Sequence, residues 1–251
     1  MGRFEGRAAV VTGAGGAIGG AIARRLGSEG ARLALGDVQD EGLEALAEAL
    51  RGVGCDVVTS TGDLSRADAA EALVGACRDR FGRVDVLVNN AGGGVIRPTL
   101  EHTEATLQAT LDRNIWTALR TTLATLPGMR ETGYGRIVFV GADSVRNGLD
   151  HHAVYNAAKG GVHAFARGLA REFARDGITA NTVAPSATAT PELAAILEGQ
   201  PDAGEAFLRV IPMGRAATLE EVASAVAYLA AEEASFITGQ VLGVNGGSTM
   251  N

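Results

Sequence analysis

The chain has 251 residues and a net charge of −7, with 46% hydrophobic and 20% charged residues, so it can bury a large core and does not have the composition of a disordered chain. It has no basic block and no apolar run long enough to cross a bilayer, which argues against nucleic-acid and membrane partners. The first residues lack a signal-peptide layout, the two cysteines form no disulfide framework, and the four histidines show no metal-ligand spacing. We therefore expect a soluble, cytoplasmic protein without a metal site.

Short β-branched runs alternate with longer amphipathic stretches along the chain. The expected strands cover residues 7–13, 31–37, 55–60, 84–90, 135–141, 178–185 and 239–247. Their apolar residues are nearly continuous rather than alternating, which is typical of strands covered on both faces. The expected helices cover residues 17–30, 65–82, 154–173 and 218–233. The second of these helices opens with a Ser-x-x-Asp cap, and the last opens with a Thr-x-x-Glu capping box.

The alternation predicts the fold class. Repeated strand–helix units with right-handed crossovers give an α/β fold, namely a doubly wound parallel sheet (Rossmann-like) with helices on both faces. Because no linker, repeat or low-complexity block interrupts the chain, we expect residues 1–251 to form a single dinucleotide-binding and catalytic domain. The least patterned part, residues 186–214, contains three prolines around two short helical pieces. An irregular insert beyond the end of a strand is where such sheets bind ligands, so we expect a substrate loop there.

The stretch "VVTGAGGAIGGAIA" predicts a strand, a glycine-rich turn and a helix. Backbone N–H groups at the start of such a helix suit a pyrophosphate. Gly13 and Gly15 fit the pattern G-x-G-x-x-G, but Ile18 occupies the position of the third glycine. Asp37 ends the second expected strand, where a carboxylate can accept both ribose hydroxyls and repel a 2′-phosphate. The pattern favours NAD as the cofactor; the alternative for Asp37 is an ordinary loop aspartate.

Lys159 is the only lysine among 22 cationic side chains, and Tyr155 precedes it by one helical turn. Lysine carries a compact charge on a slim stem, whereas arginine is a wide planar fork. The spacing places the phenol and the ammonium on one face of the expected helix, where both can act on one bound molecule. The alternative is that one lysine survived by chance in an arginine-biased sequence.

Seven short motifs, taken with their order and spacing, carry a resemblance. They are "TGAGGAIG", "GDLS" at 62–65, "NNAG" at 89–92, Asn114 in "LDRNIW", "YNAAK" at 155–159, "NTVAPS" at 181–186 and "ITGQVLGVNGG" at 237–247. Over essentially its whole length the sequence resembles the short-chain dehydrogenase/reductases. The resemblance implies an oxidoreductase that transfers a hydride between NAD and a secondary alcohol or its ketone. It also suggests a homotetramer.

The resemblance also assigns residues. Tyr155 would be the general acid/base, Lys159 would lower the pKa of the tyrosine and bind the nicotinamide ribose, and Asn114 would complete a proton relay. The expected cofactor contacts, besides Tyr155 and Lys159, are Gly13, Gly15, Gly16, Ala17, Ile18, Asp37, Asp63, Leu64, Asn90, Ala91, Gly92, Pro185, Thr188 and Thr190.

The chain departs from the family pattern at three places. Ala17 replaces a glycine of the phosphate turn, and Ser186 and Thr188 replace the usual glycine and isoleucine after Pro185. Ala142 occupies the position of the serine that holds the substrate oxygen. Three residues were considered in its place. Ser144 is the expected substitute, His152 is an alternative through its ring N–H, and Asp143 is a poor one because a carboxylate repels an alkoxide.

The substrate is less constrained by the sequence. The stretches "NNAGGGVIRPTLEH" and "GADSVRNGL" are similar to dehydrogenases that oxidise cis-dihydrodiols of aromatic acids. Four arginines are candidates for holding a substrate carboxylate, although solvated surface charge is the simpler interpretation: Arg97, Arg146, Arg209 and Arg215. Two alternatives stay open, an NADPH-dependent ketoacyl-type reductase and a catalytically silent relative that binds NAD.

Overall fold

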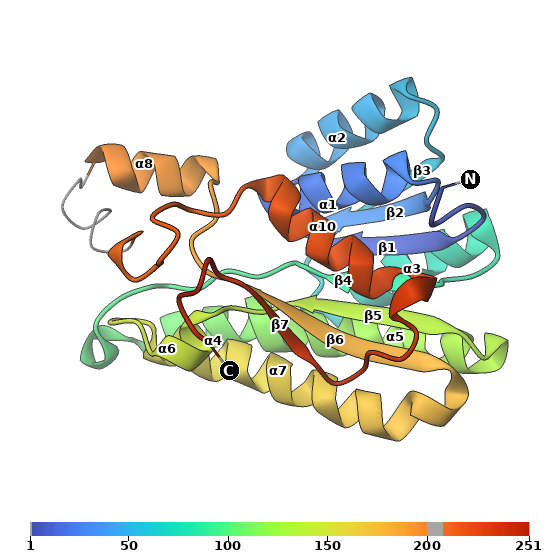
Figure 1. The fold of residues 1–251 in the computed structure, drawn as a ribbon. Coiled ribbons are helices and arrows are strands. Elements are labelled where there is room, and N and C mark those ends of the chain that lie inside the picture. Colours follow the sequence, from blue (N-terminus) through green and yellow to red (C-terminus); the bar gives the residue numbers. More distant parts are fainter. Residues whose placement is uncertain (1, 200–207, 251) are drawn as a thin grey trace.

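The computed structural model describes residues 2–199 and 208–250, and these fold around one seven-stranded sheet in the order β3-β2-β1-β4-β5-β6-β7 (Figure 1). Every neighbouring pair of strands is parallel. The strands are β1 (Ala8–Thr12), β2 (Arg32–Asp37), β3 (Val57–Thr61), β4 (Val86–Asn89), β5 (Gly135–Val140), β6 (Ile178–Pro185) and β7 (Val241–Val244). Six of the seven expected runs contain one of them, and β3 extends one residue beyond the remaining run, so the predicted doubly wound sheet is confirmed.

Helices cover both faces of the sheet (Figure 1). One face carries α1 (Ala17–Ser28), α2 (Asp40–Gly52) and α10 (Leu219–Ala230); the other carries α3 (Ala67–Phe81), α5 (Thr117–Thr132) and α7 (Ala153–Phe173). Two buried apolar clusters fill the layers, and each takes alternate residues from the central strands. Because both faces of these strands are covered, every residue of β1 and β5 is buried, and most of them are apolar.

Shorter elements complete the chain. They are α4 (Glu104–Leu111), α6 (Ser144–Asn147), α8 (Pro191–Gly199), the 3₁₀ turns Thr99–Glu101, Ala174–Asp176 and Glu232–Ala234, and a wide π-type turn at Asp112–Trp116. The segment after β6 holds α8, the first of the two helical pieces expected between residues 186 and 214. The second falls partly on residues 200–207, outside the described residues.

The four expected helices are present, with one correction at a helix start. Thr218 and Glu221 form the predicted capping box of α10. Ser65 does not cap α3, because the helix begins at Ala67 after Arg66 and no side chain caps it. Instead the amide and the hydroxyl of Ser65 both donate to Asp63 Oδ1, at 3.0 and 2.8 Å. The Ser65 hydroxyl is therefore used in the local turn with Asp63 rather than as a cap at the start of α3.

The sheet order reverses between β1 and β4. The chain runs outward from β1 through β2 to β3, then returns to β4 and continues outward to β7. At such a point the loops that follow β1 and β4 leave the sheet in opposite directions, and a crevice opens beyond the carboxyl ends of the strands. Many of the residues expected to bind the cofactor follow β1, β2 and β4, so the fold brings these to the carboxyl ends of the strands beside this crevice.

Candidate active site

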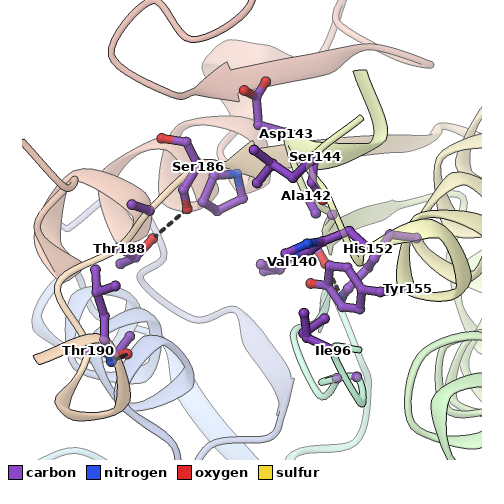
Figure 2. Close-up of a pocket in the computed structure, with 18 of the residues that line it drawn as sticks. Ile96, Val140, Ala142, Asp143, Ser144, His152, Tyr155, Ser186, Thr188 and Thr190 are labelled. Atoms are coloured by element: carbon purple, nitrogen blue, oxygen red, sulfur yellow. Dashed lines mark hydrogen bonds between the residues drawn. The ribbon is translucent and has the colours of Figure 1, made fainter. Parts of the chain in front are cut away.

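A cavity of about 450 Å³ opens beyond the carboxyl ends of β4, β5 and β6. Figure 2 shows Tyr155 and His152 on one side, with the Tyr155 hydroxyl directed into the open space, and Ser186, Thr188 and Thr190 on the opposite side. The apolar side chains of the lining are Ile18, Ile96, Val140, Ala142, Leu149, Pro185, Ala187, Leu193, Ile196, Val210 and Ile211. The cavity is therefore largely apolar, with polar side chains on both sides, among them Tyr155 and His152 on one and Ser186, Thr188 and Thr190 on the other.

Tyr155 and Lys159 lie one turn apart in the first half of α7, as the spacing predicted, and both line the cavity. Lys159 is 4% exposed, and its Nζ donates a hydrogen bond of 2.8 Å to the carbonyl oxygen of Val140. The same Nζ lies 5.9 Å from the centroid of the Tyr155 ring. The ammonium thus joins α7 to the end of β5 and lies beside the phenol.

Burial dominates the protonation of this pair. It raises the pKa of Tyr155 to about 12 and lowers the pKa of Lys159 to about 8, because the charged form of each group loses its hydration. In the protein alone the shift of the tyrosine pKa is therefore opposite to the expected one. Lowering it requires positive charge beyond that of the lysine.

Asn114 lies in the π-type turn Asp112–Trp116 between α4 and α5 and is 1% exposed. Its amide nitrogen donates to Gly93 O at 2.7 Å and to Thr110 O at 2.8 Å. A Cβ placed on Gly92 would lie 2.8 Å from Lys159 Nζ and 2.9 Å from Asn114 Oδ1. Asn114 Oδ1 and the ammonium therefore both lie against the Gly92 backbone, and the structure brings Asn114, Tyr155 and Lys159 into one site.

The crevice beside this site fits a dinucleotide. Gly13 has φ +63°, and a Cβ on it would lie 2.8 Å from Ala91 Cα, so the turn after β1 needs glycine there. Gly16 precedes α1, and no side chain caps this helix. Its first N–H groups are therefore available to an anion. Asn90 Nδ2 donates to Thr12 O and Gly13 O, both at 3.0 Å, which holds the turn against β4.

Asp37 ends β2 at the rim of the same crevice. Its Oδ2 accepts from Gly15 N at 2.9 Å, and its Oδ1 accepts from Gln39 N at 3.1 Å. A carboxylate at this position is the type of group that accepts ribose hydroxyls in such sheets, and the ribose role of Asp37 stays a prediction.

The other expected cofactor residues divide into two groups. One group lines the cavity: Ile18, Asn90, Gly92, Pro185, Thr188 and Thr190. The other, which includes Ala17 at the start of α1, Asp63, Leu64 and Ala91, lies beside the cavity rather than in its wall. The cavity wall therefore contains some of the expected cofactor residues, and their contacts with a dinucleotide stay a prediction.

Ala142 lines the cavity and supplies no hydroxyl, as the sequence indicated. Ser144, 7% exposed, also lines it, but its hydroxyl donates to Asn156 Oδ1 at 2.6 Å. His152 contacts Asp150 O through Nδ1 at 2.7 Å, and a carbonyl can only accept, so Nδ1 carries the proton. The His152 and Tyr155 rings meet edge to face at 6.0 Å. Both expected substitutes for the serine therefore reach the cavity wall.

Sequence reasoning missed His163, which continues the series Tyr155–Lys159–His163 at intervals of one turn on α7. It is 4% exposed, and its Nε2 accepts from the backbone N–H of Ala142 at 3.4 Å. Burial, with help from nearby Arg146 and Lys159, lowers the pKa of His163 to about 4, so the ring is neutral at physiological pH. The four-residue spacing was the available signal.

The arginines considered for a substrate carboxylate do not line the cavity. Arg146 donates to Val241 O at 2.8 Å, Arg215 pairs with Glu221, and Arg97 donates to Glu101 O. Among the described residues that form the cavity wall none is an arginine.

The described residues contain neither a candidate metal-binding cluster nor a candidate membrane-spanning helix. No cluster of histidine, cysteine and acidic side chains there could hold a metal ion. No helix there is both long and apolar enough to cross a membrane.

Comparison with known proteins gives consistent matches. The model of a family described as enoyl-(acyl carrier protein) reductase matches residues 13–249. The 2,3-dihydroxy-2,3-dihydro-p-cumate dehydrogenase of Pseudomonas putida is 54% identical over 248 residues, which cover 98% of this chain and 96% of that protein. A putative ketoacyl reductase of Streptomyces coelicolor is 39% identical over 257 residues, which cover 98% of this chain and 98% of that protein. The crystal structure of levodione reductase superimposes with a TM-score of 0.92 at 34% identity, covering 97% of this chain and 98% of that one.

His163 makes stability depend on pH. Its pKa is lower in the folded protein than in the unfolded chain, so protonation between pH 6.5 and 4 favours unfolding. Over that window we expect the wild type to lose stability by about 3 kcal/mol from this group, and His163→Gln to lack this part of the loss. Urea unfolding at several pH values measures it, with His102→Gln as the control. Equal pH slopes for wild type and His163→Gln would contradict the assignment.

Proposed function

This chain belongs to the short-chain dehydrogenase/reductase family of oxidoreductases, and we propose that it oxidises a cis-dihydrodiol or related secondary alcohol with NAD. The observation that carries the proposal is the pair Tyr155–Lys159. A phenol and a buried ammonium from one helical turn meet at the wall of a largely apolar cavity beside a dinucleotide crevice.

The glycine turn after β1, Asp37, and the segments after β4 and β6 would hold the cofactor. Its phosphates would meet the uncapped start of α1, and its ribose would meet Asp37. When bound, the nicotinamide accepts or returns the hydride. The protein's part is to orient the alcohol and to move a proton.

Tyr155 takes the proton from the substrate hydroxyl. In the protein alone its pKa is about 12, too high for a base at neutral pH, because the phenolate is desolvated. The positive charges of Lys159 and of an oxidised nicotinamide both favour the phenolate, and the surrounding low dielectric strengthens that effect. Proton removal by Tyr155 is thereby tied to the presence of the cofactor.

Lys159 and Asn114 keep the base in place and connect it to the interior. The ammonium donates to Val140 O and keeps further protons for the cofactor ribose and the phenol. Asn114, held by Gly93 and Thr110, places its Oδ1 against the Gly92 backbone beside the ammonium. Together they provide the start of a path by which the proton leaves Tyr155.

Ser144 holds the substrate oxygen in this proposal. For that its hydroxyl turns from Asn156 toward the cavity, a rotation about one side-chain bond. His152, beside the Tyr155 ring, is the alternative; because its Nδ1–H is bonded to Asp150 O, it would have to turn that N–H toward the cavity to donate.

The substrate assignment rests on the cumate-type relative and on the cavity. At 54% identity over nearly the full length of both proteins, that relative supports a cis-dihydrodiol substrate. A carbocyclic diol presents an apolar ring and two hydroxyls, which suits a wall that combines apolar side chains with polar ones, Tyr155 among them. The ketoacyl reductase relative supports the alternative of an NADPH-dependent reductase, which Asp37 opposes.

The family also supports a cytoplasmic homotetramer.

The proposal is tested by following NADH absorbance with the pure protein and a panel of cis-dihydrodiols, secondary alcohols and ketoesters. We expect NAD-dependent oxidation of the cis-dihydrodiols. NADPH-dependent reduction of ketoesters without diol oxidation would favour the ketoacyl alternative.

Lys159→Arg should keep the fold but lose most activity. The guanidinium is wider than the ammonium and does not fit between Val140 O and the Gly92 backbone. NADH-linked turnover and the melting temperature measure the two effects. Arg171→Lys, an exposed exchange on the same helix, is the control. Near wild-type turnover in Lys159→Arg would favour the alternative that this single lysine survived by chance in an arginine-biased sequence.

NAD should bind more tightly than NADP, because in the proposed pose the Asp37 carboxylate, held by Gly15 N, would face the extra phosphate. Placing two like charges together costs several kcal/mol, roughly a hundredfold or more in dissociation constant. Titration with both cofactors measures the two dissociation constants. Asp37→Ser should bring them closer together, whereas the control Asp68→Ser, at an exposed position, should not. Equal constants in the wild type would show that Asp37 does not face the ribose.

Ser144→Ala should lower kcat by roughly 100- to 1,000-fold, the usual cost of one oxygen-holding donor, and leave NAD affinity unchanged. Ala142→Ser in that background should restore part of the rate. If Ser144→Ala turns over normally and His152→Ala does not, the histidine holds the oxygen. If neither change alters turnover of any oxidisable substrate, the result would favour the alternative of a catalytically silent relative that binds NAD.

A further inference from the structure

Asp143 is a buried carboxylate that the proposed chemistry does not use. It lies between Ala142 and Ser144, lines the cavity and is 0% exposed. Its amide donates to Pro185 O at 2.8 Å, which joins the segment after β5 to the end of β6. A buried carboxylate is costly unless donors surround it, so its partners decide whether this part of the wall stays folded.

The donors to this carboxylate come mainly from the turn after β7. Asn245 Nδ2 and Thr249 Oγ1 both donate to Asp143 Oδ1, at 2.9 and 2.5 Å. Asn147 Nδ2 approaches Oδ2 at 3.4 Å and also donates to Ser248 Oγ at 2.9 Å. Residues more than a hundred positions later in the chain therefore satisfy the charge of the active-site segment.

The turn itself is built to present these donors. Asn245 is 8% exposed, and its Oδ1 accepts from Gly247 N at 3.1 Å. Its Nδ2 also donates to Thr249 O and Thr249 Oγ1, both at 3.0 Å. Gly246 and Gly247 have φ +58° and +89°, a backbone conformation that favours glycine. Ser248 from this turn lines the cavity.

The short helix α6 depends on the same residue. The amides of Arg146 and Asn147 donate to Asp143 O at 2.8 and 3.3 Å, and Gly148 N donates to Ser144 O at 2.9 Å. Ser144 is the first residue of this helix. Any displacement of Asp143 therefore moves the Ser144 hydroxyl relative to Tyr155.

We propose that residues 245–249 are a positioning element of the active site, which through the buried carboxylate of Asp143 holds α6, and with it Ser144, against the cavity. Asp143, Asn245 and Thr249 are positioning residues and do not touch the reacting atoms. The effect on catalysis rests on the proposed function, whereas the effect on α6 does not.

The test replaces Thr249 with valine, which has the same shape and lacks the hydroxyl. Thr249→Ser keeps the donor and serves as the rescue. Thr132→Val is the control. It removes a hydroxyl that donates to nearby backbone carbonyls at the end of α5, next to the start of β5 and therefore at the other end of the sheet from the cavity. Hydrogen exchange of the amides of residues 144–148 reports on α6 without any substrate.

We expect Thr249→Val to exchange at residues 144–148 roughly tenfold faster, since a donor to a charged group is lost, with little change in β5 and α7. kcat on an oxidised diol should fall by a similar factor, with NAD affinity retained and Thr249→Ser like the wild type. Unchanged exchange in Thr249→Val would overturn the link to α6. Faster exchange with unchanged kcat would overturn the positioning role, and absence of turnover in the wild type would count against the proposed function alone.

Discussion

The hydrogen bond from Lys159 Nζ to Val140 O is the interaction on which the site depends. It joins the helix that carries the base to the last residue of a central strand, and it does so with a buried charge. An ammonium that is 4% exposed has few alternative partners, so α7 has one favourable position relative to β5. The Tyr155 hydroxyl, one turn earlier, takes its place in the cavity from that position.

The segment after β5 is held from three directions. Lys159 and His163 bind it from α7, Pro185 O binds Asp143 from β6, and the turn after β7 binds the Asp143 carboxylate. None of these contacts is apolar, and all are buried or partly buried. Polar contacts in a low dielectric have narrow geometric optima, so they define positions that apolar packing leaves loose. The two apolar clusters stabilise the layers, and the buried polar groups place the reacting side chains.

Charge and desolvation act against each other at Tyr155. Burial that excludes water from the reacting bond also raises the pKa of the phenol, to about 12 in the protein alone. The protein supplies one positive charge, that of Lys159, whose own pKa burial lowers to about 8. In the proposed function the nicotinamide would supply a second positive charge. In the proposed function this balance would make Tyr155 an effective base only with the cofactor bound.

The amino-acid sequence by itself determined the layers and most of the chemistry. Continuous apolar strands, the glycine turn with Asp37, and the spacing of Tyr155 and Lys159 are local patterns, so they could be read from neighbours along the chain. Local patterns failed where a turn competes with a helix cap, as at Ser65, and where helices such as α2 and α5 were not recognised. They also could not reveal that His163 binds the Ala142 amide or that Thr249 satisfies Asp143. Those contacts join residues that are distant in sequence, and only the crossover connections of the folded sheet bring them within hydrogen-bonding distance.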